Sequence, residues 1–128
     1  MEEPPGRGET VLVVEDDADL RRLVAKILNG LGYRVLEAGD GAQALATLER
    51  TPGVDLLLSD VVLPGGESGP EIVAQAERHH PGLKSLFMSG YAPRGLSHQG
   101  RLPEGAALLK KPFTRHDLAQ KVRAVLDG

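Results

Sequence analysis

Short aliphatic runs alternate with segments of helical spacing along most of the chain, and this alternation constrains the fold more than any other feature. The runs are TVLVVE (10–15), YRVLEA (33–38), VDLLLSD (54–60), KSLFMSG (84–90) and GAALLKK (105–111). Continuous apolar runs, rather than runs that alternate apolar with polar residues, are typical of parallel strands covered on both faces. Strands that alternate with helices predict a doubly wound α/β fold, with a five-stranded parallel sheet and helices on both faces.

Four segments carry the expected helices, and they cover 18–32, 40–50, 69–80 and 114–128. The first has an apolar stripe that we expect to face the core, formed by Leu20, Leu23, Val24, Ile27, Leu28 and Leu31. Gly32 ends this helix, and Asp40 is the expected N-cap of the second. Pro70 suits the first turn of the third, and Thr114 stands three residues before Asp117 at the start of the last.

The segment APRGLSHQGRLPE (92–104) departs from this pattern, because its Gly and Pro content favours only a short or irregular helix. The start of the chain, MEEPPGRGE (1–9), is acidic and rich in Pro and Gly. It has the character of neither a signal peptide nor a transit peptide. We expect a disordered lead or linker at 1–9 and one domain at 10–128.

Composition narrows the class of protein. With 41% hydrophobic but only 3% aromatic residues, the core must be aliphatic, and the absence of cysteine excludes disulfides and thiolate metal sites. The net charge of −3 argues against a protein that binds nucleic acid directly. No apolar run approaches the ~20 residues that a membrane helix needs. We therefore expect no membrane insertion and a cytoplasmic location.

Polar residues stand where the expected strands end, and in an open parallel sheet sites form outside the carboxyl ends of the strands. Glu15 and Asp16 follow the first run, Asp60 ends the third, Ser89 lies at the end of the fourth and Lys111 ends the fifth. The second run ends in the letters EAG and offers fewer polar groups for a site. Acids, a hydroxyl and a lysine are thus expected at one edge of the sheet.

This set of groups suits phosphoryl chemistry. Clustered carboxylates with no His or Cys partner favour a hard divalent cation such as Mg²⁺, which often shares its site with a phosphate. An aspartate kept ionised beside such a cation can act as a nucleophile and form an acyl phosphate. Ser89 can hydrogen-bond one phosphoryl oxygen and Lys111 can pair with another, which would stabilise the charge of an in-line transfer.

Four motifs occur in order at these strand ends: VVEDD (13–17), LLLSDVVLPGGESG (56–69), LFMSGYA (86–92) and LLKKPF (108–113). Each motif is weak by itself, but together they are highly specific. Through them the chain, from about Thr10 to its last residue, resembles the receiver domain of two-component response regulators. The resemblance implies a flavodoxin-like sheet with the strand order 2-1-3-4-5.

The resemblance also implies roles for single residues. Asp60 matches the phosphoacceptor aspartate and contributes to the metal site. Glu15 and Asp16 match the acidic pair that binds Mg²⁺, Asp16 directly and Glu15 through water. The backbone carbonyl of Val62 matches the third ligand that the protein supplies.

Ser89 matches the conformational-switch hydroxyl and Lys111 the family's lysine, and the bond from Lys111 to Pro112 is expected to be cis. Leu108 stands where the family usually has Tyr or Phe, so the switch lacks its usual aromatic partner. The loop 61–69 is one residue longer than the commonest form. This loop and the letters SGYA and KPF most resemble receivers at the C-terminal end of hybrid sensor histidine kinases, and they also occur in stand-alone regulators.

The implied function is a phosphoacceptor switch. A sensor histidine kinase or its phosphotransfer domain would supply the phosphoryl group, the domain would catalyse its own phosphorylation at Asp60, and a downstream phosphotransfer or output protein would read the change. Such a domain is a self-catalysing acceptor rather than a turnover enzyme; in a hybrid protein, the parent would be a histidine kinase. The alternative is a docking module with a receiver fold that works without phosphorylation.

Two further classes are disfavoured. Phosphohydrolases with an aspartate nucleophile commonly carry a second acid two residues later to protonate the leaving group, and Val62 cannot do this. A nucleotide-binding Rossmann domain needs a Gly-rich loop after the first strand, and acids stand there instead.

Other polar residues are expected to have only structural or surface roles. Asp17 is the expected N-cap of the helix at 18–32, and Lys110 is a solvated neighbour of Lys111. His79 and His80 are expected to close the helix at 69–80, either solvated or favourable at its C-terminal end, without a metal role. His98 and His116 are expected on the surface. A role for Tyr91 in access to the phosphoryl group is left open.

Overall fold

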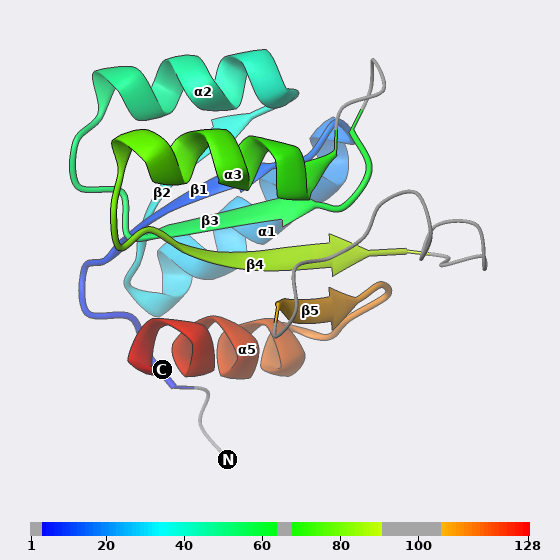
Figure 1. Cartoon of the computed structure of the whole chain (residues 1–128). Coiled ribbons are helices and arrows are strands. Elements are labelled where there is room, and N and C mark those ends of the chain that lie inside the picture. Colours follow the sequence, from blue (N-terminus) through cyan, green and yellow to red (C-terminus); the bar gives the residue numbers. More distant parts are fainter. Residues whose placement is uncertain (1–3, 64–67, 91–105) are drawn as a thin grey trace.

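The structure is a computed structural model that describes residues 4–63, 68–90 and 106–128 (Figure 1). One sheet of five parallel strands crosses the molecule in the order β2-β1-β3-β4-β5. The strands are β1 (Thr10–Val14), β2 (Arg34–Ala38), β3 (Leu56–Asp60), β4 (Lys84–Ser89) and β5 (Ala107–Lys110). The structure thus confirms the predicted strands and their flavodoxin-like order.

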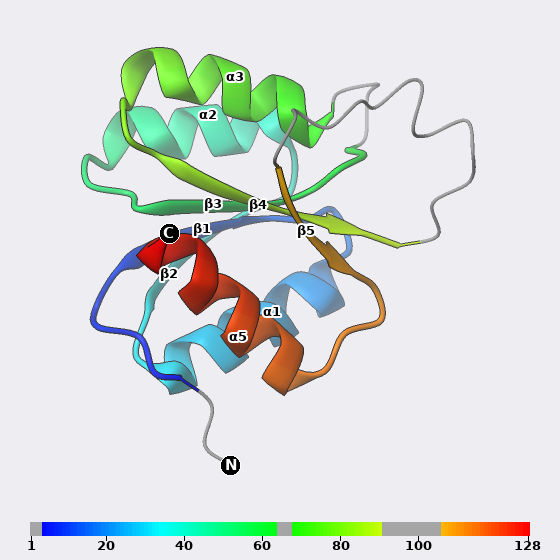
Figure 2. The ribbon, with the colours of Figure 1, turned by 60° about the horizontal axis from the view of Figure 1, so that its bottom comes forward.

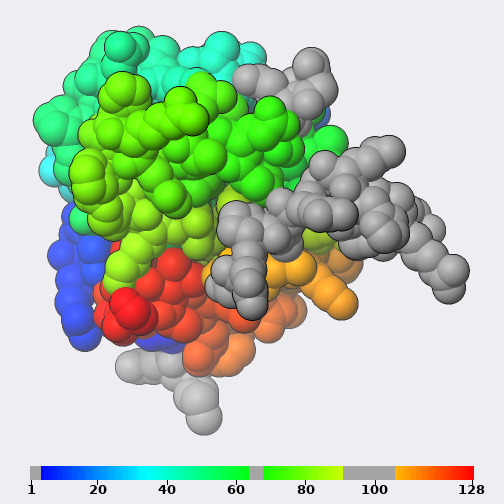
Figure 3. Space-filling model, viewed as in Figure 1, coloured from blue at the N-terminus to red at the C-terminus, as the bar shows by residue number. Residues whose placement is uncertain are grey.

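The described helices cover both faces of the sheet. They are α1 (Ala18–Leu31), α2 (Gly41–Arg50), α3 (Gly69–His79) and α5 (Arg115–Asp127). α2 and α3 lie on one face, and α1 and α5 lie on the other (Figures 1 and 2). In the space-filling view, α2 and α3 form the upper part of the visible face and α5 forms the lower part (Figure 3). The short or irregular helix expected at 92–104 lies outside the described residues.

Helix ends form where the sequence predicts them. Asp17 caps α1 by accepting hydrogen bonds from two backbone N–H groups of the first turn. Gly32 ends α1 with a φ of 106°, in the left-handed region that favours glycine. Asp40 caps α2, and Thr114 and Asp117 form a capping box at the start of α5. No described helix has both the length and the apolar character that a membrane span requires.

Successive strand residues point to opposite faces, so the core has two layers. The layer towards α1 and α5 includes Val11, Val13, Leu56, Leu58, Leu86, Met88, Val24, Leu28, Leu118 and Val122. The layer towards α2 and α3 includes Leu12, Val14, Leu57, Phe87, Ala44, Leu48, Ile72 and Ala76. Nearly all of these side chains are aliphatic, as the composition predicts.

The apolar stripe of α1 is wider than the face that packs on the sheet. Val24 and Leu28 are fully buried, whereas Leu23 is 53% exposed, so the expectation that Leu23 faces the core is wrong. Leu23 lies about 100° around the helix from Val24, at the margin of the packed face. With Ile27 and Phe113 it lines a groove of about 490 Å³ beside the β5–α5 connection.

Residues 4–9 lie against the end of α1. The backbone N–H groups of Gly6 and Gly8 donate to carbonyls of the last turn and C-cap of α1, at 2.7 and 3.0 Å. A Cβ at Gly6 would lie 2.8 Å from the ring of Tyr33, so only glycine allows this close approach. The boundary between a lead at 1–9 and the domain stays a prediction.

Arg123 of α5 connects this segment to the last helix. Its guanidinium pairs with Glu9 at 2.7 Å and with Asp127 at 2.8 Å. It also donates to the backbone carbonyl of Pro5 and to the hydroxyl of Tyr33, both at 3.4 Å. The hydrogen bond from Arg123 lowers the pKa of Glu9 to about 2, and the pKa of Asp127 is lowered for the same reason. We call Arg123, Glu9 and Asp127 the Arg123 cluster.

Candidate functional site

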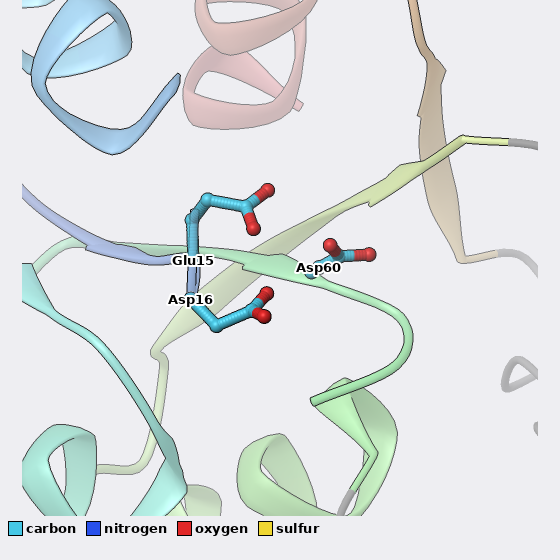
Figure 4. A group of neighbouring side chains, drawn as sticks. All are labelled: Glu15, Asp16 and Asp60. Carbon is cyan, nitrogen blue, oxygen red and sulfur yellow. The ribbon is translucent and has the colours of Figure 1, made fainter. Parts of the chain in front are cut away.

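Two neighbouring strands bring three carboxylates together. β1 ends just before Glu15, and β3 ends at Asp60. Carboxylate oxygens of Glu15, Asp16 and Asp60 lie within 4.8 Å of one another and point into one space beyond the strand ends (Figure 4). Within the described part of the chain, no other group of three or more His, Cys, Asp or Glu side chains is close enough to share a metal ion.

Lys111 reaches this space from the connection that follows β5. Its Nζ lies 2.5 Å from Oε1 of Glu15 and 2.9 Å from Oδ2 of Asp60. Its backbone N–H donates to the carbonyl of Ser89 at 2.7 Å, and its bond to Pro112 is cis, which confirms the expectation. We call the three acids and Lys111 the acid pocket. One ammonium faces three carboxylates, so the pocket is short of positive charge.

Burial makes the charge on Glu15 unfavourable. Only 1% of Glu15 is exposed, and this burial raises the pKa of its carboxyl, although hydrogen bonds from Lys111 and from the backbone N–H of Asp17 oppose the rise. For Lys111, burial alone would lower the pKa, but the hydrogen bonds with Glu15 and Asp60 outweigh it and raise the pKa. The raised pKa of Lys111 shows that the neighbouring carboxylates favour positive charge at this position, and the raised pKa of Glu15 shows that burial disfavours its negative charge.

The possible metal ligands of the acid pocket, Glu15, Asp16 and Asp60, suit Mg²⁺. All of them are carboxylates, the hard oxygen ligands that this ion prefers. Glu15 is buried and Asp60 half-buried, but Asp16 is exposed, so the pocket opens to solvent on one side. Mg²⁺ commonly keeps several of its waters, and an open side leaves room for them. The residues present therefore fit the cation that the sequence predicts.

Gly69, at the start of α3, lets this helix pack directly on the end of β3. A Cβ there would press into the backbone oxygen of Asp60 and lie 3.0 Å from Oγ of Ser59. The N–H of Gly69 donates to the carbonyl of Val61 at 2.8 Å, and the N–H of Val61 donates to Met88 at 2.9 Å. The backbone next to Asp60 is thus held between α3 and β4. Gly69 could not be singled out from the sequence, because close packing leaves no motif of its own.

Three further residues singled out from the sequence lie at or next to strands β3, β4 and β5. Ser89 is buried at the end of β4, in register with Lys110. Val62 is 51% exposed and forms an isolated bridge just before α3; the use of its carbonyl as a metal ligand stays a prediction. Leu108 is in register with Phe87 and packs, partly buried, on the α2–α3 side of the core.

The residues that we expected to have only structural or surface roles behave as expected where the structure describes them. Asp17 is the N-cap of α1, which confirms its structural role. His80 is the C-cap of α3. Three predicted surface residues are exposed: Lys110, His79 and His116. Tyr91 and His98 lie outside the described residues.

Arg21 is a neighbour of the pocket that the sequence analysis missed. Its Nη1 donates to the backbone carbonyl of Glu15 at 2.7 Å, and its Nε pairs with Glu37 at 3.2 Å. Glu37 lies in β2, the strand whose end offered less chemistry. Arg21 follows the N-cap Asp17 by four residues, so about one helical turn brings it back over the strand end. This spacing is the one trace of the contact in the sequence.

A five-stranded parallel sheet in this order, with acids at the ends of β1 and β3 and a lysine after β5, defines a receiver domain. The sequence model described as "Response regulator receiver domain" matches residues 11–123. The chain therefore belongs to the response regulator receiver domain family of two-component signalling. Receiver domains bind Mg²⁺ at such an acidic pocket, and a receiver domain implies a histidine kinase partner.

The chain is similar to relatives of two kinds. It is 36% identical over 116 residues to the response regulator receiver protein CpdR of Brucella abortus, covering 91% of this chain and 95% of CpdR. It is 38% identical over 121 residues to the sensor kinase CckA of Brucella abortus, covering 92% of this chain and 12% of CckA. A crystal structure of the receiver domain from the hybrid histidine kinase CckA matches with a TM-score of 0.74 and 32% identity, covering 91% of this chain and 98% of that chain.

Proposed function

We propose that the chain is a phosphoacceptor switch in which Asp60 takes a phosphoryl group from a histidine kinase. The observation that carries the proposal is the 2.9 Å contact of Lys111 with Asp60 beside two further carboxylates, in a receiver fold. The acceptor carboxylate of Asp60 points into the same space as the carboxylates of Glu15 and Asp16 (Figure 4). This space opens to solvent at Asp16, which is exposed. A donor can therefore approach Asp60 from that side.

In the proposed transfer, a carboxylate oxygen of Asp60 attacks the phosphorus of a phosphohistidine. The phosphorus–nitrogen bond breaks as the phosphorus–oxygen bond forms, and the imidazole nitrogen keeps the electron pair and takes up a proton from water. Lys111 already contacts Asp60 and is placed to pair with a phosphoryl oxygen after transfer. A bound Mg²⁺ would supply neutralisation of the charge on the transferring phosphoryl group.

Phosphorylation would then act on the end of β4. The proposed switch residue, Ser89, would move towards the phosphoryl group and shift a two-state equilibrium of the neighbouring backbone. Because Lys111 donates its backbone N–H to the carbonyl of Ser89, β5 is coupled to the same movement. Leu108 offers no aromatic ring to follow Ser89, so the change in β5 is transmitted by the backbone contact.

The test compares two aspartates with the same substitution. With acetyl phosphate or a purified histidine kinase and Mg²⁺, Asp60→Asn should abolish labelling, because an amide cannot form the acyl phosphate. Asp17→Asn is the matched control: Asn also caps helices well, so labelling should stay near the wild-type level. Equal labelling of both variants, or no labelling of the wild type, would contradict the proposal and favour the docking module that works without phosphorylation.

We infer, more narrowly, that the chain is a receiver of the kind found in hybrid sensor histidine kinases. The long loop 61–69, the letters SGYA and KPF, and the 38% identity to CckA support this inference. The 36% identity to CpdR supports a stand-alone receiver instead. The gene sequence upstream of codon 1 discriminates between them. A reading frame continuous with kinase domains supports the hybrid type, and an immediate stop codon with a ribosome-binding site contradicts it.

A further inference from the structure

Arg21 holds the backbone directly behind the acid pocket. Its Nη1 donates to the carbonyl of Glu15 at 2.7 Å, and its Nε contacts Glu37 at 3.2 Å. The side chain of Arg21 is 19% exposed, so it is fixed between α1 and the end of β2 rather than extended into solvent. A charged donor with two acceptors in a fixed geometry is a strong local constraint.

The turn after β2 lies directly against this guanidinium. A Cβ at Gly39 would lie 3.3 Å from Nη1 of Arg21, closer than ordinary van der Waals contact. The N–H of Gly39 donates to Oε1 of Gln43 at 2.9 Å, which holds the turn against the first residues of α2. A larger residue at Gly39 would push the guanidinium away from the carbonyl that it contacts.

The contact completes the hydrogen bonding of Glu15. The other polar groups of this residue already have partners: its N–H donates to the carbonyl of Ala38 at 3.1 Å, and its carboxylate contacts Lys111 and the N–H of Asp17. The carbonyl is the remaining group, and Arg21 donates to it. Glu15 is therefore held at every polar atom.

Fixing this carbonyl has a direct effect on the next residue. The peptide group is planar, so an arginine that holds the oxygen of Glu15 also holds the nitrogen of Asp16. The carboxylate of Asp16 is exposed, and its direction therefore depends on the backbone beneath it. Arg21 thus fixes the backbone from which the side chain of Asp16 extends.

We propose that Arg21 is a positioning residue for the Mg²⁺ site, acting through the peptide group between Glu15 and Asp16 and supported by Glu37. The proposal rests on the proposed function, because it assumes that the acid pocket binds Mg²⁺. Arg21 is then a second cation beside the pocket, and it serves geometry rather than charge balance.

The sign of a mutational effect separates positioning from charge. Arg21 is positive, so its charge alone repels Mg²⁺, and removal of that charge would tighten metal binding. If Arg21 instead positions Asp16, its removal weakens metal binding in spite of this. Arg22 is the matched control, because it is the next residue, carries the same charge and is exposed.

The experiment measures the Kd for Mg²⁺ by isothermal titration calorimetry. Arg21→Gln should raise the Kd about tenfold, at the lower end of the effects known for residues that orient metal ligands. Arg22→Gln should leave the Kd unchanged or lower it. An unchanged or lower Kd for Arg21→Gln would overturn the proposal. If the wild type itself binds no Mg²⁺, the proposed function falls and the positioning role falls with it.

A second readout uses no metal. Backbone amide NMR shifts of Arg21→Gln should change around residues 15–17 and 37–39 and stay near those of the wild type elsewhere. Shift changes spread over the whole sheet, or a variant that does not fold, would show a role in the scaffold and overturn the assignment.

Discussion

The acid pocket and the Arg123 cluster lie at opposite ends of the sheet and contain the same kinds of group, but they treat charge in opposite ways. In the Arg123 cluster, the hydrogen bond from the guanidinium lowers the pKa of Glu9 to about 2, so the ionised state is favoured. In the acid pocket, burial raises the pKa of Glu15 despite the contact with Lys111. The first cluster is complete in the folded chain, and the second is left open for a cation.

The shape of each cation contributes to this difference. A guanidinium has five N–H donors in one plane, and Arg123 uses them on two carboxylates, a backbone carbonyl and a hydroxyl. An ammonium is a compact charge with three donors, and Lys111 contacts two of the three acids. The third acid, Asp16, lies beside them and adds a charge that Lys111 alone does not balance.

The largest effect on stability is expected at Arg123. Arg123→Met keeps an unbranched apolar stem but leaves Glu9 and the carbonyl of Pro5 without their donor. We expect a loss of about 2–3 kcal/mol in the free energy of unfolding, below the loss for a fully buried pair because Asp127 is half exposed. Urea unfolding measures this, with the exposed Arg22→Met as the control. Equal losses in the two variants would show that the Arg123 cluster does not stabilise the fold.

Mg²⁺ should stabilise the fold through the acid pocket and not through the Arg123 cluster. At a free Mg²⁺ concentration ten times the Kd, the free energy of unfolding should rise by about 1.4 kcal/mol. Asp16→Ala should remove most of this increase, whereas Arg123→Met should keep it. Thermal unfolding with Mg²⁺ and with EDTA provides the comparison. An increase that survives in Asp16→Ala would mean that Asp16 is not the ligand.

Neutralising one glutamate in each cluster should have opposite effects. Without Mg²⁺ at pH 7, Glu9→Gln should lower the free energy of unfolding by about 1 kcal/mol, because it weakens a charge-assisted hydrogen bond. Glu15→Gln should raise it by up to about 1 kcal/mol, because it removes a charge from a buried position next to other acids. Urea unfolding in EDTA measures both. Changes of the same sign would break the contrast between the clusters.

The smallest expected effect is the pH dependence of the free energy of unfolding, which should differ in sign between Glu9 and Glu15. The pKa of Glu9 is lower in the folded chain than its ordinary value of 4.5, so its stabilisation is present above pH 4.5 and is lost as the pH falls towards about 2. The difference in stability between the wild type and Glu9→Gln should therefore shrink to near zero at that pH. The pKa of Glu15 is raised, so its unfavourable effect is instead present at high pH and is relieved as the carboxyl takes up a proton.

Much of the fold could be predicted because it depends on local patterns. The strand runs and the caps at Asp17, Asp40 and Gly32 each involve residues within a few positions of one another. The strand order came from the resemblance, since parallel pairing leaves no local trace. The expectation for Leu23 failed because helical spacing identifies an apolar stripe but not the width of the face that packs.

The acids and the lysine of the pocket could be predicted because each stands at a strand end. The contacts of Arg21 and Arg123 could not. Arg21 donates to the backbone carbonyl of Glu15, and a carbonyl is the same at every position in a sequence. Arg123 contacts Glu9 and Pro5, which stand in a segment without apolar periodicity, more than a hundred positions away along the chain.

The separation between Lys111 and its partners has a consequence for synthesis. Glu15 and Lys111 are 96 positions apart, and Asp60 and Lys111 are 51 apart. A nascent chain therefore displays all three acids long before the ribosome adds the ammonium that pairs with two of them. Under the proposed function, a chain that ends before Lys111 lacks the lysine of the acceptor site. Such a chain cannot assemble the site, so the domain can receive a phosphoryl group only after all five strands have been synthesised.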